Sequence, residues 1–108
     1  MSEEATDKNF NEKVIEASKT KPVLVKFTAD WCGPCRQIAP ILEDIAGEKG
    51  DAMSLISLDT DMNTKTVIAY NVSSIPMMLL FVNGEVVKTV IGTRPKAILK
   101  KEFSPWLD

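Results

Sequence analysis

The segment that most constrains the fold is Val23 to Ala29, which reads VLVKFTA. It is almost continuously apolar and rich in β-branched residues, a pattern typical of a β-strand that is buried on both faces. Such a strand lies inside a sheet and needs a covering layer on each side. Lys26 interrupts the run with a charge. Because burial of an unpaired ammonium group is costly, Lys26 must reach water, meet a carboxylate or lose its proton.

Helical patterns lie on both sides of this strand. A helix is expected before it, over about residues 7–17, capped by Thr6 or Asp7. A longer helix is expected over about residues 34–48, even though it contains Pro40. The apolar positions of these two helices are Phe10, Val14, Ala17, Ile38, Ile41, Leu42 and Ile45.

The second half of the chain predicts a strand over residues 53–59, a short helix capped by Asn63 or Thr64, and a hairpin over residues 76–92. The pair Asn83-Gly84 suits the type I′ turn of that hairpin. A last helix opens near Pro95 and is expected to end at Pro105. Its inward positions are expected to be Ala97, Ile98, Leu99 and Phe103.

The order α, β, α, β, α, β, β, α predicts the α/β fold class. The early βαβ units favour parallel pairing with right-handed crossovers, and the hairpin adds an antiparallel part. We therefore expect a mixed central sheet of four to five strands, flanked by helices on both faces. Whether residues 1–6 add a strand stays open, because MSEEAT is polar and shows no strand-like alternation.

The composition predicts a single globular domain over residues 1–108. The chain is 44% hydrophobic and 26% charged, with a formal net charge of -2, so no excess of basic residues favours nucleic acid. No apolar run approaches the roughly 20 residues of a membrane span. The polar start lacks the apolar stretch of a secretory signal, so a cytoplasmic location and no membrane association are expected.

Histidine is absent and cysteine occurs twice, at Cys32 and Cys35. The missing histidine excludes His-ligated metals and nucleophilic catalysis by a Cys-His pair. Two thiols also cannot form a four-thiolate zinc or iron–sulfur site within one chain. No metal and no bound cofactor are therefore expected.

The two cysteines stand in WCGPC, between the central strand and the long helix. Free N–H groups and the positive end of the helix dipole stabilise a thiolate at Cys32, the form that attacks disulfides. Pro34 suits the first helical turn, and Gly33 is expected to allow a tight turn and to leave the Cys32 sulfur open. Cys35, one turn later, could then resolve the mixed disulfide. This pattern favours a reversible redox pair.

Two other roles of the cysteines fit the sequence less well. They could supply half of a zinc site that a second chain completes, but Pro34 and the strand-to-helix context fit that poorly. They could also form a purely structural bond. A bridge over two intervening residues removes little chain entropy, so that role is disfavoured.

The motif and its surroundings resemble the thioredoxin family. FTADWCGPCRQIAPILEDIA, LDTDMN, SIPMMLLFVNGEVV and IGTRPKAILKKEF all occur in the family's order. The resemblance implies the thioredoxin fold and a monomeric protein-disulfide reductase. Its electrons would come from a flavin-dependent thioredoxin reductase, and its substrates would be disulfide-containing proteins.

The resemblance also implies a substrate-binding surface. Pro76, after Ile75, corresponds to a cis-proline beside the active site of the family, where an extended peptide could pair with the backbone. Trp31, Ile91 and Gly92 would complete this shallow apolar surface. Ordinary core burial of the isoleucines is the alternative. The three methionines Met62, Met77 and Met78 are expected to fill core gaps.

Three positions depart from the family pattern: Lys26, Thr28 and Ser57. Most members have a buried aspartate where Lys26 stands, a lysine where Ser57 stands and a tryptophan where Thr28 stands. A cation near Cys35, without the carboxylate, would favour the thiolate and make the pair more oxidising. Alternatively, the head of Lys26 reaches solvent or a carboxylate and hardly affects the sulfurs.

Two other function classes follow from the same residues. The altered positions leave open a thioredoxin-fold binding or scaffold subunit of a larger assembly, in which the cysteines are incidental. A disulfide oxidase or isomerase is disfavoured by the Gly-Pro pair between the cysteines and by the missing signal sequence. The leading hypothesis is a thiol-disulfide oxidoreductase acting through Cys32 and Cys35.

Overall fold

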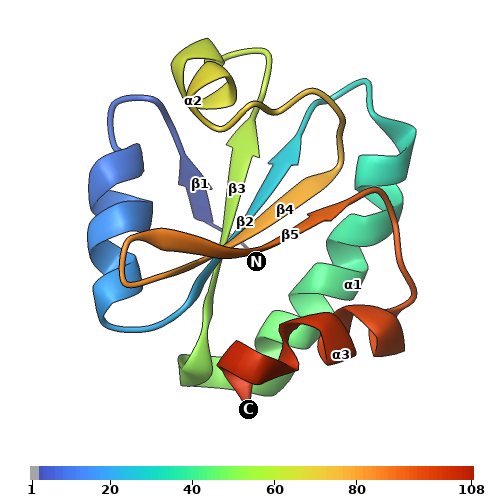
Figure 1. Ribbon diagram of the computed structural model, residues 1–108. Coiled ribbons are helices and arrows are strands. Elements are labelled where there is room, and N and C mark those ends of the chain that lie inside the picture. The colour runs from blue at the N-terminus through green and yellow to red at the C-terminus, as the bar shows by residue number, and fades with distance from the viewer. Residues whose placement is uncertain (1–2) are drawn as a thin grey trace.

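A computed structural model describes residues 3–108, and Met1 and Ser2 lie outside the described residues. The described strands form one mixed five-stranded sheet in the order β1-β3-β2-β4-β5 (Figure 1). β1 and β2 run parallel to β3, whereas β4 runs antiparallel to both β2 and β5. The strands are β1 (Glu3–Ala5), β2 (Val23–Thr28), β3 (Ser54–Asp59), β4 (Met77–Val82) and β5 (Glu85–Ile91).

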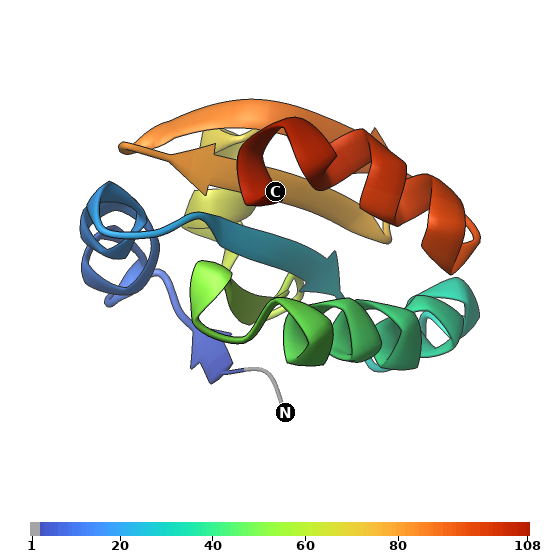
Figure 2. The same cartoon turned by 90° about the horizontal axis from the view of Figure 1, so that it is seen from below.

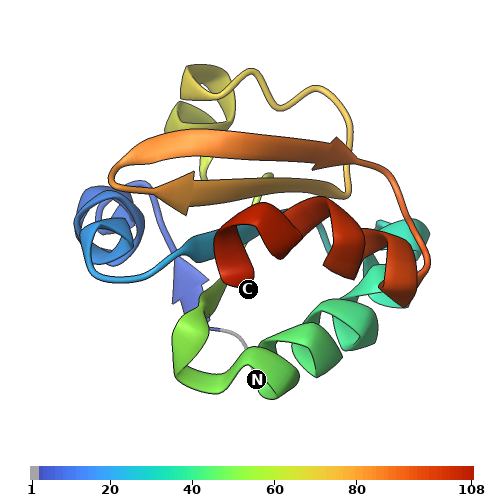
Figure 3. The same cartoon turned by 60° about the horizontal axis from the view of Figure 1, so that its bottom comes forward.

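The helical elements cover the sheet on both faces, as the sequence predicts. In Figures 2 and 3, α1 and α3 lie in front of the strands and α2 lies behind them. The elements are η1 (Asn11–Glu16, a π-helical turn), η2 (Ala17–Lys19), α1 (Gly33–Lys49), η3 (Gly50–Ala52), α2 (Thr64–Ala69) and α3 (Lys96–Leu107). The α/β fold class and the mixed central sheet are confirmed.

β2 separates two hydrophobic cores, because its side chains alternate between the faces. Val23, Val25 and Phe27 point into the core that η1 and α2 cover. Leu24 points into the other core, between the sheet and the pair α1 and α3. The apolar run in the sequence is therefore a central strand, buried on both faces.

A strand at the N-terminus, which the sequence left open, is present over Glu3–Ala5. It pairs parallel to β3, with Ala5 opposite Leu58. Ala5 is buried, whereas Glu3 and Glu4 remain exposed. The backbone pairing does not require apolar side chains at the exposed positions, which is why the polar sequence gave no strand-like pattern.

The two capping candidates near residue 6 serve different helices. Thr6 caps the turn that leads into η1: its Oγ1 accepts from the N–H of Asn9 at 3.4 Å, and Asn9 Oδ1 accepts from the N–H of Thr6 at 2.7 Å. The Asp7 carboxylate instead caps α2, accepting from the backbone N–H groups of Lys65 at 3.2 Å and Thr66 at 2.9 Å. Asn63 is the N-cap residue of α2, as predicted, but its side chain makes no capping hydrogen bond to this helix.

The hairpin prediction is confirmed. Asn83 and Gly84 connect β4 to β5 with φ angles of 53° and 81°, both in the left-handed region that a type I′ turn requires. Buried Ser18 ties this turn to η2. Its hydroxyl accepts from the N–H of Gly84 at 2.7 Å, and its carbonyl accepts from the N–H of Asn83 at 2.9 Å.

The prediction for the last helix is wrong in two respects. α3 continues through Pro105 to Leu107. Pro105 has no N–H to donate to the carbonyl of Lys101, but the Ser104 hydroxyl donates to that oxygen at 3.0 Å, so the helix loses little there. The buried positions are Leu99, Phe103 and Leu107, and the expected inward residues Ala97 and Ile98 are exposed.

An ion-pair cluster joins α1 to α3. The Glu48 carboxylate pairs with Lys96 and, at 2.7 Å, with Lys100. Hydrogen bonds from these two ammonium groups lower the pKa of Glu48 from 4.5 to about 2. A carboxyl group with a lowered folded-state pKa stabilises the fold above its unfolded-state pKa. That contribution is lost as the pH falls through the folded value.

We expect Glu48→Gln to flatten the acid dependence of stability. Between about pH 5 and pH 2, the free energy of unfolding should fall less steeply in the variant than in the wild type. Urea denaturation across this range measures the effect. Glu12→Gln is the matched control, since Glu12 is an exposed carboxylate with no ion pair among residues 3–108. If the free energy of unfolding falls equally steeply with pH in wild type, Glu48→Gln and Glu12→Gln, the lowered pKa of Glu48 does not contribute to acid sensitivity.

Candidate active site

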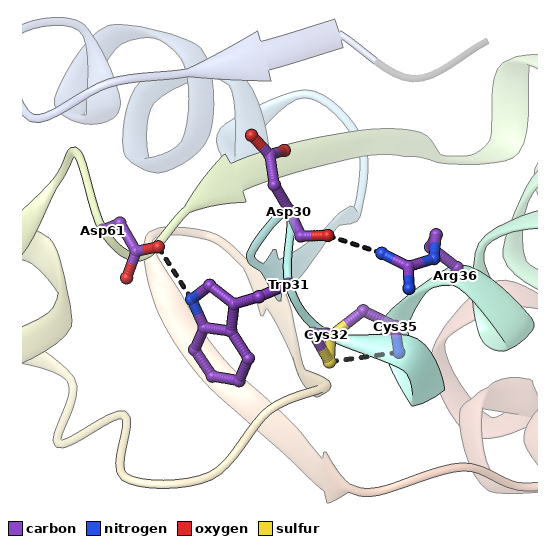
Figure 4. The surroundings of a disulfide bond; sticks show 6 residues. All are labelled: Asp30, Trp31, Cys32, Cys35, Arg36 and Asp61. Atoms are coloured by element: carbon purple, nitrogen blue, oxygen red, sulfur yellow. Dashed lines mark hydrogen bonds between the residues drawn. A yellow bond between two sulfur atoms is a disulfide. The ribbon is translucent and has the colours of Figure 1, made fainter.

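Cys32 and Cys35 form a disulfide at the start of α1, with their Cα atoms 5.3 Å apart (Figure 4). Cys32 is the N-cap residue of this helix and has extended backbone angles. Pro34 occupies the first turn, where a missing N–H costs nothing. The predicted placement of a reversible cysteine pair between a strand and a helix is therefore confirmed in its geometry.

A backbone donor is aimed at the first sulfur. The N–H of Cys35 donates to Cys32 Sγ at 3.2 Å, the position that a serine or aspartate oxygen takes in an ordinary N-cap. An N–H group there, together with the helix dipole, stabilises negative charge on Sγ once the disulfide is reduced. A thiolate at this N-cap position is therefore more stable than a thiolate in the middle of a helix, where no free N–H group is available.

Both sulfurs lie beneath the surface in the disulfide form. Cys32 is 3% exposed and Cys35 is 4% exposed, and they pack with Ala29 and Ile75 in a small apolar cluster. The expectation that the Cys32 sulfur stands open to a partner is therefore wrong for this oxidised state. The cause is the apolar contact that Ala29 and Ile75 make with the bridge.

Gly33 is not required for the backbone geometry. Its φ is not in the left-handed region, and a Cβ built on it would meet nothing within 4 Å. The backbone at residue 33 therefore does not depend on glycine, and an added side chain would face open space.

Trp31 is 67% exposed beside the disulfide and is held by a carboxylate that sequence reasoning missed. Its indole N–H donates to Asp61 Oδ2 at 2.8 Å (Figure 4). The backbone N–H of Asp61 donates in turn to Asp59 Oδ1 at 2.8 Å. The ends of the parallel strands β2 and β3 meet at one edge of the sheet. The polar residues after β3 could therefore have been predicted to lie near Trp31.

The expected substrate-binding residues come together around the end of β5. The Ile75–Pro76 peptide bond is cis, as the family resemblance implies. The carbonyl of Pro76 accepts from the N–H of Gly92 at 2.8 Å, which joins the proline loop to the end of β5. Ile75 is half-buried against the cysteines, whereas Ile91 is 48% exposed, so Ile91 is not a core residue.

The methionine expectations are partly confirmed. Met77 and Met78 are buried on β4, one in each core. Met62 is 79% exposed, so the prediction that it fills a core gap is wrong. It lies in the short loop after β3, whose backbone N–H groups bond to Asp59 and whose residues pack little against the sheet.

Lys26 is buried in β2, where it lies opposite Ser57 of β3 and Met78 of β4. Burial lowers the pKa of Lys26, and the nearby Glu43 carboxylate partly offsets this. Lys26 Nζ has no hydrogen-bond partner among residues 3–108. In that range, the one fully buried side-chain nitrogen or oxygen without a hydrogen-bond partner is Glu102 Oε2. Because Lys26 Nζ also has no partner, it is not fully buried and keeps a route to solvent. These features support the alternative in which the head of Lys26 reaches solvent or a carboxylate, and an effect of its charge on Cys35 stays a prediction.

Neither a metal centre nor a membrane span was found in the described part of the chain. Within residues 3–108, no group of three or more cysteine or carboxylate side chains could hold a metal ion. No helix in the same range is long and apolar enough to cross a membrane.

The thioredoxin family model matches residues 1–104 of the chain. A thioredoxin of Mycolicibacterium smegmatis is 48% identical over 101 residues, which cover 92% of this chain and 88% of that protein. A thioredoxin of Listeria monocytogenes is 41% identical over 107 residues, covering 99% of this chain and all of that protein (100%). The family-model match includes the cysteine pair and all five strands of the described sheet.

One relative carries a second activity in its name. The bifunctional thioredoxin reductase/thioredoxin of Mycobacterium leprae is 44% identical over 101 residues. The match covers 94% of this chain but 22% of that protein. In that relative, a sequence like this one is fused to a thioredoxin reductase.

We expect Gly33→Ala and Gly92→Ala to behave differently. An added Cβ at residue 33 has open space, so the free energy of unfolding should change by less than about 0.5 kcal/mol. Gly92 has φ +87°, and its added Cβ would lie 3.5 Å from Arg94 Nη1. Gly92→Ala should therefore destabilise the fold by about 1 kcal/mol or more. Chemical denaturation measures both, and equal losses would contradict this account.

Proposed function

This chain belongs to the thioredoxin family and is a thiol-disulfide oxidoreductase, and we propose that it reduces protein disulfides by exchange through Cys32 and then Cys35. The observation that carries the proposal is the disulfide at the N-terminus of α1, where the N–H of Cys35 is aimed at Cys32 Sγ. In the dithiol form that geometry favours the thiolate on Cys32, and the thiolate is the nucleophile of disulfide exchange.

The exchange proceeds in two steps. Cys32 Sγ attacks one sulfur of the target disulfide, forming a mixed disulfide and releasing the other target sulfur as a thiolate that takes up a proton. Cys35 then loses its proton, and its sulfur attacks Cys32 Sγ. The second target sulfur leaves, and the Cys32–Cys35 bond forms. The target gains two electrons and two protons, and the dithiol loses the same number.

The docking surface consists of Trp31, Ile75, Pro76, Ile91 and Gly92. The exposure of Trp31 and Ile91 and the contact of Ile75 with the buried cysteines support this assignment. An extended segment of the target would lie along this loop and pair with its backbone. The apolar contacts would bring the target sulfur to Cys32 Sγ beside Gly33, where an added Cβ would meet nothing within 4 Å.

The electron donor in this proposal is a flavin-dependent thioredoxin reductase. The relative that fuses both activities in one chain supports this pairing. The substrates are disulfide-containing proteins. The working unit is a single thioredoxin domain over residues 1–108, a cytoplasmic monomer that binds neither nucleic acid nor membrane. Its redox group is the cysteine pair itself, with no metal or further cofactor.

A thioredoxin-fold scaffold with incidental cysteines is not favoured. The cysteines, the proline loop and the end of β5 are assembled in one place, and the relatives at 48% and 41% identity are thioredoxins. An incidental pair would have no need of a backbone donor aimed at the first sulfur or of an exposed indole beside it.

Lys26 is a redox-tuning residue in this proposal, together with Gly33 and Pro34. Lys26 follows Leu24 by two residues in β2, so its side chain leaves the sheet on the face covered by α1, the helix that carries Cys35. A positive charge there favours the Cys35 thiolate and hence the dithiol. Burial, which lowers the pKa of Lys26, increases its neutral fraction. Neutral Lys26, or water reaching it, would accept the Cys35 proton.

We expect Cys32→Ser to abolish the reduction of insulin disulfides by the protein. Cys35→Ser should instead accumulate a mixed disulfide with the target, because the attack on Cys32 Sγ is missing. Turbidity of reduced insulin and non-reducing mass spectrometry measure the two outcomes. If Cys32→Ser instead accumulates the mixed disulfide, Cys35 is the attacking cysteine and Cys32 the resolving one. A partner captured equally by wild type and by Cys32→Ser, without insulin reduction, would support the scaffold function.

We expect Lys26→Asp to make the protein more reducing. Replacing a cation by an anion raises the thiol pKa of Cys35. A rise of about one pKa unit corresponds to roughly 30 mV. Equilibration with several ratios of reduced to oxidised glutathione measures the redox potential of the cysteine pair. Lys26→Met removes the charge but keeps a side chain of similar size, so it separates the effect of charge from that of volume. A potential that is unchanged or higher in Lys26→Asp would exclude electrostatic tuning and leave Lys26 as a solvent-reaching side chain.

A further inference from the structure

Arg94 lies at the border of the docking surface. β5 ends at Ile91, and the N–H of the next residue, Gly92, donates to the carbonyl of Pro76 at 2.8 Å. Ile75, just before Pro76, contacts the cysteine pair. Arg94 follows Gly92 by two residues and therefore lies close to the contact between the end of β5 and the proline loop.

The guanidinium group of Arg94 is fixed on the backbone of this surface. Its Nη1 donates to the carbonyl of Ile91 at 2.9 Å and to the carbonyl of Thr93 at 3.0 Å. Nη1 also lies 3.5 Å from the position that a Cβ on Gly92 would take. The side chain therefore folds back over Gly92 instead of extending freely into solvent, which reduces the entropy lost when a ligand binds it.

Part of this guanidinium group remains available. Among residues 3–108, Arg94 has no carboxylate partner, and both of its hydrogen bonds leave from Nη1. A guanidinium group has five N–H donors, so Nε and Nη2 can still donate to a ligand. Two N–H groups in one plane match the two oxygens of a carboxylate.

The other charged groups near the site lie on other elements. Arg36, on α1, donates one N–H to the carbonyl of Asp30 and keeps further free N–H groups, and Asp61 accepts the indole N–H of Trp31. Lys96, two residues after Arg94, pairs with Glu48 on α1. Arg94 is therefore the cation that lies against Gly92 at the end of β5.

We propose that Arg94 is a specificity-determining residue, which binds an aspartate or glutamate side chain close to the reacting cysteine of a disulfide-containing polypeptide. The inference rests on the proposed reductase function. Because exposed ion pairs contribute little, the preference for an acidic over a neutral side chain should be about two- to fivefold in kcat/KM. It should fall as ionic strength rises.

The experiment uses pairs of disulfide-containing peptides that differ in a single residue, glutamate against glutamine, placed in turn at each position next to the reacting cysteine. The rate of reduction is measured for wild type and Arg94→Gln. The ratio of the two rates cancels any general effect of the substitution on catalysis. We expect at least one position where wild type prefers glutamate, and the loss of that preference in Arg94→Gln.

Two further variants separate Arg94 from the rest of the surface charge. Lys101→Gln removes the same charge from an exposed position of α3 and should keep both the overall rate and the preference. Arg94→Lys should keep part of the preference, because the charge stays but the two-pronged donor is lost. If Lys101→Gln also loses the preference for glutamate, the preference is a general charge effect. If Arg36→Gln loses the preference while Arg94→Gln keeps it, Arg36 is the residue responsible. Either result would overturn the proposal.

The remaining outcomes are also distinct. Equal rates for glutamate and glutamine peptides at every position in wild type would overturn the role of Arg94 and leave the reductase function intact. If wild type reduces neither peptide, while the reductase and electron source are shown to work on a small-molecule disulfide, the proposed function itself fails.

Discussion

The structure depends on the burial of β2 on both of its faces. This strand lies between β3 and β4, its side chains alternate between two cores, and its end delivers the chain to the cysteines. Because the ladder on each side fixes β2, the loop that follows starts from a rigid point. Cys32 can then serve as the N-cap of α1 in one defined position, which a loop between mobile elements could not ensure.

The same constraint explains how the site reconciles stability with reactivity. The oxidised sulfurs are almost fully buried against Ala29 and Ile75, so the disulfide adds to the packing of the fold. A thiolate needs polar stabilisation, and here the backbone supplies it through the N–H of Cys35 and the dipole of α1. No charged side chain has to enter the apolar cluster. The environment can therefore hold an uncharged disulfide and a charged thiolate in the same place.

Sequence reasoning succeeded where the determining interactions are local. The helix that starts at the cysteines follows from Pro34 and the apolar period, and the hairpin follows from Asn83 and Gly84. It failed where the partner is distant. Asp7 caps α2 by bonding to Thr66, 59 residues away, although a local pattern favoured other caps. Trp31 bonds to Asp61 across the sheet edge, and this pairing becomes evident only once β2 and β3 are known to be parallel neighbours.

In these proposals, two cations of this chain act on different terms of the same reaction. Lys26 is buried in the sheet, and its charge would affect the stability of the dithiol equally for every substrate. Arg94 lies next to the end of β5 with free N–H groups at Nε and Nη2, and its charge would contribute only when the substrate carries a complementary group. A buried charge is weakly screened by salt and a rim charge is strongly screened. The driving force and the selectivity of the exchange can therefore vary independently in a fold of this size, because they depend on residues in separate dielectric environments.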